Sequence, residues 1–228
     1  MAERWEEAKS GQGQVVLLSG EAGIGKSRLV QGLKDHVAEG LHTRLECRSS
    51  PYYQNTVLYP IIDLSERGAG FHRDDSPQVK LDKLEHTLSQ YQRPLEETVP
   101  LFAAFLSLPV PENRYPALNL SPQQQRKQTL ETTVALLLER AERQPLLFIV
   151  EDLHWTDPTT VELLGLLIDQ APTASILILL TCRPTFQPNF THKTLHYLCG
   201  SPRTSVRTPT TCLLPFMSGS PRALIQQT

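Results

Sequence analysis

A glycine-rich segment near the N-terminus has the residue types and spacing of a phosphate-binding loop. It reads "GEAGIGKS" over residues 20–27, and its Gly20, Gly25, Lys26 and Ser27 satisfy the pattern G-x-x-x-x-G-K-[ST]. Glycines at these positions let the backbone wrap tightly, so that successive N–H groups point at phosphate oxygens. Lys26 would place a positive charge on the β- and γ-phosphates, and the Ser27 hydroxyl would ligate Mg²⁺.

The predicted nucleotide contacts extend over the whole loop and into the turn that follows it. The residues are Gly20, Glu21, Ala22, Gly23, Ile24, Gly25, Lys26, Ser27 and Arg28. A helix expected directly after the loop would add its N-terminal dipole to the same site. The alternative, a glycine-rich turn with an incidental lysine, is disfavoured because a strand pattern precedes the loop and a helix pattern follows it.

Two adjacent carboxylates stand much further along the chain, in "FIVEDLHWTDP". An apolar run ends at Val150, and Glu151 and Asp152 follow it. A phosphate-binding loop needs a second magnesium anchor at the end of a neighbouring strand, and hydrolysis needs a group that orients or deprotonates water. Because side chains alternate along a strand, we predict that Glu151 holds the magnesium and Asp152 faces the γ-phosphate. The reverse assignment stays open, so Ser27, Glu151 and Asp152 are all candidate metal ligands.

A third feature is the arginine that ends "LLTCRP". Ligands of an open parallel sheet bind beyond the carboxyl ends of its strands, where Arg183 is expected to lie. Arg183 could sense the γ-phosphate by charge-assisted hydrogen bonds, and it joins Asp152 and Glu151 in the candidate catalytic set. The alternative is an exposed arginine at the end of a strand.

The residues after the acid pair have simpler interpretations. His154 either approaches the phosphate region or is an ordinary loop residue, and no other residue is spaced to share a metal with it. Trp155 is interpreted as a packing residue. Asp157 is predicted to cap a helix, because Pro158 follows it.

The elements that must position these residues are strands alternating with helices. The predicted strands cover 14–20, 42–48, 145–152 and 174–184, and the predicted helices cover 3–9, the segment from the loop to about 40, 58–67, 78–92, 95–107, 121–143 and the segment from 157. The two late strands are continuous apolar runs, which indicates burial on both faces in a parallel sheet. We therefore predict an α/β three-layer sandwich, with a helical insertion between the second and third strands.

Composition limits the classes of protein to consider. The chain has 228 residues, a net charge of −2 and no apolar run long enough for a bilayer, so neither nucleic acid nor a membrane is a predicted partner. The N-terminus does not read as a signal peptide, and the four scattered cysteines are predicted to be reduced thiols of a cytoplasmic protein. Residues 187–228 contain no Asp or Glu and are rich in Ser, Thr and Pro, which favours a disordered tail after a core of residues 1–186.

With these residues placed, the chain resembles the AAA-type ATPase modules called origin-recognition-like, within the STAND signalling NTPases. Such modules lie beside bacterial nucleotide cyclase or LuxR/MalT-type regulatory domains. The resemblance is carried by "LLSGEAGIGKSRLV", "LLFIVEDLHWTDPTTVELL" and "ILILLTCRP", and it covers roughly residues 4 to 186. It implies binding of ATP, or of GTP, with Mg²⁺, slow hydrolysis and a nucleotide-dependent switch. It also implies that Arg183 occupies the sensor position of the fourth strand, and that a protein partner or output domain lies outside this chain.

The chain also departs from the family pattern. The family has a G-R-E segment upstream, and it continues into a fifth strand, a helical lid and often a winged helix. Here the acid-free tail stands in that place, so we predict that the fifth strand is absent and that the edge of the first strand is open. The corresponding hypothesis is an open reading frame that is truncated or frameshifted.

The sequence leaves three other interpretations of the chain open. The first is a nucleotide-gated interaction module that does not hydrolyse, and the second is an inactive fragment. The third is a small-molecule phosphotransferase, which the adjacent acids and the strand-end arginine disfavour.

Overall fold

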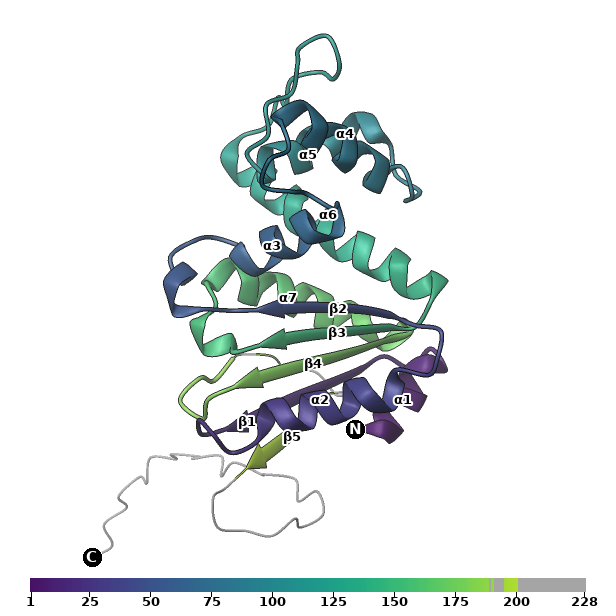
Figure 1. The fold of residues 1–228 in the computed structure, drawn as a ribbon, viewed down its shortest axis with the longest axis vertical. Coiled ribbons are helices and arrows are strands. Elements are labelled where there is room, and N and C mark those ends of the chain that lie inside the picture. The colour runs from purple at the N-terminus through teal and green to yellow at the C-terminus, as the bar shows by residue number, and fades with distance from the viewer. Residues whose placement is uncertain (189, 191–194, 201–228) are drawn as a thin grey trace, which may run out of the picture.

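The computed structural model describes residues 1–188, 190 and 195–200, and these form a parallel five-stranded sheet with helices on both faces (Figure 1). The strands are β1 (Gln14–Gly20), β2 (Thr43–Arg48), β3 (Leu146–Glu151), β4 (Ile176–Cys182) and β5 (Leu195–Gly200), in the order β2-β3-β4-β1-β5. Every pairing is parallel, so all the strands end at one edge of the sheet. The predicted α/β fold class is confirmed.

The apolar runs form the strands because each strand is covered on both sides. Every residue of β4 is buried, and in β3 only Glu151 is partly exposed. One face of β1 presents Val15 and Leu17 to one core, and the other face presents Val16 and Leu18 to a second core. This alternation follows from the two-residue period of a strand.

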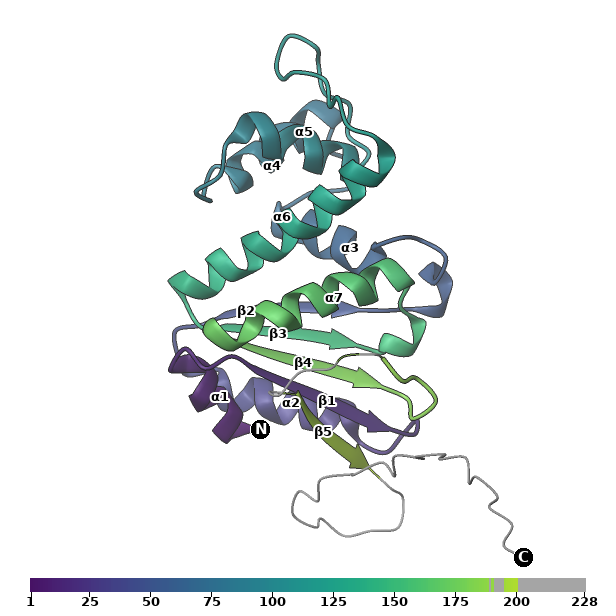
Figure 2. The same cartoon turned by 180° about the vertical axis from the view of Figure 1, so that it is seen from behind.

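Helices cover both faces of the sheet, and α4 and α5 lie beyond it in the insertion (Figures 1 and 2). They are α1 (Ala2–Lys9), α2 (Lys26–Val37), α3 (Tyr59–Gly68), α4 (Pro77–Leu88), α5 (Leu95–Phe105), α6 (Pro122–Arg143) and α7 (Pro158–Gln170), with short 3₁₀ turns at Pro51–Tyr53, Leu153–Trp155 and Ala171–Thr173. The helices α1 and α2 cover one face, and α7 covers the other, as the front and back views show (Figures 1 and 2). None of the helices in the described part is both long and apolar enough to cross a membrane.

The helix α2 buries a narrow stripe against the sheet. Val30, Leu33 and Val37 are buried there, but the adjacent apolar residue Leu29 is 53% exposed. Leu29 instead lines a surface hollow beside the loop.

The prediction that no fifth strand is present is wrong. Residues 195–200 form β5 along the outer edge of β1, with Val15 opposite Leu195 and Gly20 opposite Gly200. The prediction was based on the composition of the whole tail. A short edge strand needs only one partner strand and a few apolar residues, such as those in "LHYLCG". The predicted core boundary at 186 therefore does not mark the end of the sheet. The disorder predicted for 201–228 lies outside the described residues.

The segment between β2 and β3 is a helical insertion, as predicted. Its own apolar core is built from residues of α4, α5 and α6, among them Leu84, Phe102 and Leu136. The helix α6 begins with a capping box, in which the side chains of Ser121 and Gln124 each accept a hydrogen bond from the other residue's backbone N–H.

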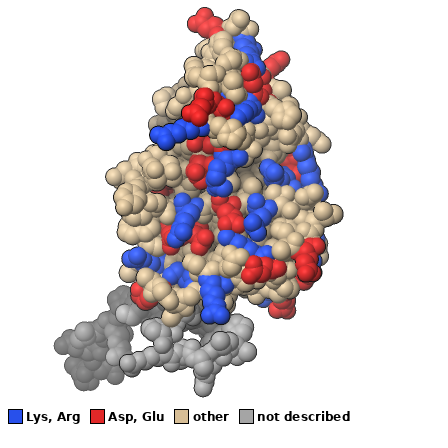
Figure 3. All heavy atoms as spheres, viewed as in Figure 1, with Lys and Arg blue, Asp and Glu red and all other residues tan. Residues whose placement is uncertain are grey.

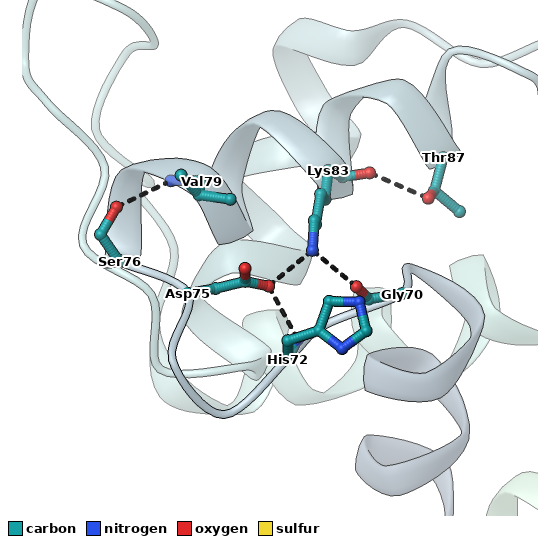
Figure 4. A network of polar contacts seen from close by, with 7 residues as sticks. All are labelled: Gly70, His72, Asp75, Ser76, Val79, Lys83 and Thr87. Atoms are coloured by element: carbon teal, nitrogen blue, oxygen red, sulfur yellow. Dashed lines mark hydrogen bonds and ion pairs between the residues drawn. The ribbon is translucent and has the colours of Figure 1, made fainter.

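Polar contacts fix the connection between α3 and α4 (Figure 4). The Lys83 ammonium donates to the Asp75 carboxylate at 2.6 Å and to the Gly70 carbonyl at 2.8 Å. The same carboxylate accepts the His72 backbone N–H at 2.7 Å. The hydrogen bond from Lys83, followed by that from His72, lowers the pKa of Asp75.

Candidate functional site

The glycine-rich segment is a loop that joins the end of β1 to the start of α2. Gly23 and Gly25 have φ of +78° and +101°, a region in which residues with a side chain are strained. The helix starts at Lys26, and no side chain caps its N-terminus. The first N–H groups of α2 therefore have no side-chain acceptor, which is the arrangement that favours an anion.

The side chain of Lys26 folds back against the backbone of this loop. Its ammonium donates to the carbonyls of Gly20 at 2.7 Å and Glu21 at 2.9 Å. Ser27 and Arg28, the next two residues of α2, are exposed. The predicted phosphate-binding residues are thus contiguous, and they present backbone N–H groups, a hydroxyl and an ammonium to one region.

The acid pair lies at the same edge of the sheet, but its two members differ in conformation. Glu151 is the last residue of β3 and is half-buried. Asp152 has left-handed φ and ψ of 62° and 44°, so the strand that was predicted to reach 152 ends one residue earlier. The alternation used to separate the two side chains therefore does not apply to Asp152.

Two neighbouring strands hold Asp152. Its backbone N–H donates to the hydroxyl of Thr181 in β4 at 3.0 Å, and Thr181 is 1% exposed. Its carboxylate lies 3.3 Å from Nε of Arg48, the last residue of β2. Arg48 was not among the predicted site residues, because only the order of the strands shows that β2 ends beside β3.

Arg183 lies just beyond β4, as predicted, and is exposed. Its guanidinium carbon is 5.5 Å from the centre of the Trp155 ring, a distance compatible with a cation–π contact. Trp155 therefore orients the arginine, a role that the packing interpretation did not include.

His154 is the least satisfied side chain at this edge. Both of its ring nitrogens are buried without a hydrogen-bond partner in the described structure. Burial lowers the pKa of His154, the charges of Arg183 and Lys26 lower it further, and Asp152 acts in the opposite direction. The pKa of His154 thus lies below the ordinary 6.5, which favours the neutral imidazole at pH 7.

Asp157 caps α7, as predicted, and also fixes a second segment. One carboxylate oxygen accepts the N–H groups of Thr159 at 3.0 Å and Thr160 at 3.1 Å. The other accepts the Thr160 hydroxyl and, at 3.1 Å, the N–H of Leu58 just before α3. Asp157 is 5% exposed, so it is a structural residue rather than a ligand for substrate.

Two hollows flank these residues. One, of about 610 Å³, runs along α2 from Ile24 and Gly25 past Arg28 and Leu29 to Met1. The other, of about 370 Å³, lies beside Asp152 on the side of β2. The first adjoins the phosphate loop and has room for the base and ribose of a nucleotide.

The donor set fits magnesium bound together with phosphates. In the described residues no cluster of three or more His, Cys, Asp or Glu side chains is arranged for a metal ion. Mg²⁺ needs no such cluster when phosphates and water fill most of its shell, since one or two carboxylates then suffice. Ser27, Glu151 and Asp152 supply a hydroxyl and two carboxylates, which are oxygen ligands of the kind that Mg²⁺ binds.

Charges of both signs are interleaved over the face shown in Figure 3. Glu46 of β2, for example, pairs with Lys34 at 2.5 Å and with Arg44 at 2.8 Å. This face of the described molecule therefore does not form a uniformly basic surface of the kind that nucleic acids require.

The parallel sheet, the glycine loop after β1 and the acids after β3 define a nucleotide-binding α/β domain of the P-loop class. Residues 1–179 match the AAA ATPase domain family, and the chain belongs to that family. Membership supports nucleotide binding and ATPase activity.

Individual relatives are more distant. An uncharacterized protein of Rhizobium meliloti (strain 1021) is 27% identical over 183 residues, which is 80% of this chain but only 17% of that protein. A STAND protein of Pyrococcus horikoshii with a tetratricopeptide repeat sensor aligns over 88% of this chain and 22% of its own, at 13% identity and a TM-score of 0.39. The Drosophila origin recognition complex bound to AT-rich DNA and Cdc6 contains a chain that aligns over 88% of this one and 52% of its own, at 13% identity and a TM-score of 0.38.

Proposed function

We propose that this chain binds ATP with Mg²⁺ at the carboxyl edge of the sheet and hydrolyses it slowly. The observation that carries the proposal is the loop itself. Gly23 and Gly25 adopt left-handed conformations, α2 begins without a side-chain cap, and the Lys26 ammonium lies within the loop. Together these features supply backbone donors and a positive charge to a triphosphate. GTP is the alternative nucleotide.

We assign Ser27 and Glu151 to the magnesium. The ion, when bound with the triphosphate, neutralises charge on the β- and γ-phosphate oxygens. Glu151 ends β3 and is half-buried, so its carboxylate is held by a rigid strand. This supports Glu151, rather than Asp152, as the residue that anchors the ion directly or through water.

Asp152 is then the residue that orients or deprotonates the attacking water. Its pair with Arg48 is long, and the Arg48 side chain is 72% exposed, so the pair opposes a rotation of the carboxylate only weakly. Arg183 supplies positive charge to the γ-phosphate, and neutral His154 supplies one donor and one acceptor. The buried, unpartnered nitrogens of His154 support this role.

The base and ribose are assigned to the hollow along α2. The hollow begins at Gly25 in the loop and continues past Arg28 and the exposed side chain of Leu29. An apolar side chain beside a guanidinium suits the face of a purine.

Calorimetric titration of Mg-ATP into the full chain and into Lys26→Ala tests the site. We expect the variant to bind at least about 100-fold more weakly, because a charge-assisted contact to phosphate is lost. Lys34→Ala is the matched control, since Lys34 lies at the far end of the same helix and pairs with Glu46. Unchanged affinity in Lys26→Ala would overturn the proposal.

A second candidate is a nucleotide-gated module that does not hydrolyse. The specific observation in its favour is the direction of the Asp152 carboxylate, which pairs with Arg48 on the β2 side of β3, away from β4 and β1. Steady release of phosphate that is lost in Asp152→Asn, with ATP binding retained, would exclude it.

The wider role proposed is that of a nucleotide-dependent signalling switch with an output partner outside this chain. The chain spans 17% of the Rhizobium relative, which leaves most of that protein for other tasks. Limited proteolysis of the chain with Mg-ATP and with Mg-ADP tests the switch. Different cleavage patterns are expected, and identical patterns would contradict it.

A further inference from the structure

A cavity of about 110 Å³ lies between the sheet and the helical insertion. Its wall includes Leu45 of β2 and residues of all four insertion helices, α3 to α6. Ile61 and Leu137 on this wall belong to the core of the sheet, whereas Leu84 and Phe102 belong to the core of the insertion. None of the predicted nucleotide-site residues lines it. The cavity is therefore a separate feature, at the junction of two cores.

The wall is mainly apolar, and three of its four hydroxyl-bearing side chains already donate to an acceptor, the exception being Tyr91. Ser65, Thr87 and Thr133 each donate to a carbonyl of their own helix, at 2.7, 2.9 and 2.7 Å. Such hydroxyls can still accept a hydrogen bond but have no proton to offer. An occupant of this part of the cavity would thus be apolar.

One charged side chain, Arg140 of α6, lines the same cavity. It is half-buried, and one of its nitrogens donates to the Tyr91 hydroxyl at 3.2 Å. In the described part of the chain no carboxylate pairs with it, although Arg143, one turn later, pairs with Glu139. A guanidinium has five N–H donors, so most of those on Arg140 are available. An uncompensated cation beside an apolar cavity calls for an anion with an apolar body.

We propose that this cavity binds a small carboxylic acid with a branched or cyclic apolar body. The carboxylate accepts hydrogen bonds from Arg140 at the cavity wall, and the body fills the space between α3, α4 and α6. A dry cavity of about 150 Å³ lined by apolar side chains admits benzene, so this one suits a body of about five heavy atoms. The competing account is that Arg140 packs its stem on the wall and extends its charge into water.

Titration of 3-methylbutanoate into the full chain, followed by ligand-observed NMR, tests the site. A dissociation constant on the order of 1 mM is expected for a ligand of this size. The alcohol 3-methylbutan-1-ol lacks the charge, and acetate lacks the body, so each should bind at least about tenfold more weakly. Absence of binding by 3-methylbutanoate to the folded chain would overturn the proposal.

Two variants test separately the charge of Arg140 and the volume of the cavity. Arg140→Gln should weaken the acid at least about tenfold and leave the alcohol unchanged, since only the charge-assisted bonds are lost. Thr87→Leu should weaken both, because the added bulk fills the cavity. Lys127→Gln, which removes a positive charge from an exposed position of the same helix outside the cavity wall, is the matched control and should bind the acid normally. Equal binding of the acid by wild type and Arg140→Gln would show that Arg140 serves only as a solvated side chain.

Discussion

The carboxyl edge of the sheet and the helical insertion differ in how most of their charged side chains are paired, although the described insertion also holds Arg140, which has no carboxylate partner there, and a buried Glu85 Oε1 without a hydrogen-bond partner. In the insertion, Lys83 pairs with Asp75, and Arg114 pairs with both Asp82 and Glu85. At the edge, among the described residues, both ring nitrogens of His154 have no partner, the Lys26 ammonium bonds only to carbonyls, and Arg183 lies over an aromatic ring. Groups that satisfy one another stabilise a fold, whereas groups held without partners are available to a ligand.

The largest loss of stability is expected at Asp157, which is an exception to this contrast. Asp157 lies near the edge but is fully hydrogen-bonded, so it should behave as a structural residue. Asp157→Ala leaves buried N–H groups of Leu58, Thr159 and Thr160 unpaired and is expected to lower the free energy of unfolding by about 2–4 kcal/mol. Urea denaturation measures this loss.

The matched control for Asp157 is Ser121→Ala at the exposed start of α6, for which a loss of about 1 kcal/mol is expected. If Asp157→Ala and Ser121→Ala lower the free energy of unfolding equally, the contacts of Asp157 outside its own helix contribute nothing to stability.

His154, at the carboxyl edge, is expected to contribute to ligand binding and not to stability. The imidazole is half-buried, and its two buried nitrogens have no partner among the described residues, so an apolar side chain of similar size removes no bond and His154→Leu should be neutral or more stable by about 1 kcal/mol. The same variant should bind Mg-ATP about tenfold more weakly if the imidazole contacts the γ-phosphate. A loss of stability with unchanged affinity would make His154 a structural residue.

The contacts of Asp75 in the insertion predict a stability that depends on pH. Its pKa lies below the ordinary 3.8 because Lys83 and the His72 N–H bind the carboxylate. A lowered folded-state pKa stabilises the fold at pH above the unfolded value, and this contribution is lost as pH falls through the folded value. Asp75→Asn should therefore lower the urea midpoint at pH 7, and the difference from wild type should shrink below pH 4.

The exposed neighbour Asp74, which takes no part in the network of Figure 4, provides the control for Asp75. Asp74→Asn should leave the midpoint unchanged at both pH values. A pH-independent effect of Asp75→Asn would indicate that shape rather than charge matters there.

Arg48→Ala should have the smallest effect on stability. The pair with Asp152 is 3.3 Å long and its arginine is 72% exposed, so the free energy of unfolding should change by no more than about 0.5 kcal/mol. A loss above that figure, measured by urea denaturation, would place Arg48 among the structural pairs typical of the insertion.

The strands and helices were predictable wherever local chemistry alone decides. The apolar runs of β3 and β4 are continuous because both faces are covered, and the Ser121 capping box is complete within four residues. The strand β5 was missed because an edge strand is specified by its partner, β1, more than by its own sequence.

The candidate site was predictable in its residues but not in its geometry. The loop pattern names Lys26 and Ser27 directly, and the position after β3 names the acids. The left-handed conformation of Asp152 was not predictable, because it depends on Thr181 from β4. The contact with Arg48 likewise requires the order of the strands, which a single sequence does not state.

The helix α6 gives the molecule one further property. Its consecutive residues Leu136 and Leu137 belong to different cores, the first to the insertion and the second to the sheet. Neither core can lose this helix without exposing apolar surface in the other, so the two should melt together. A single calorimetric transition, with equal van't Hoff and calorimetric enthalpies, is the expected signature of this shared helix.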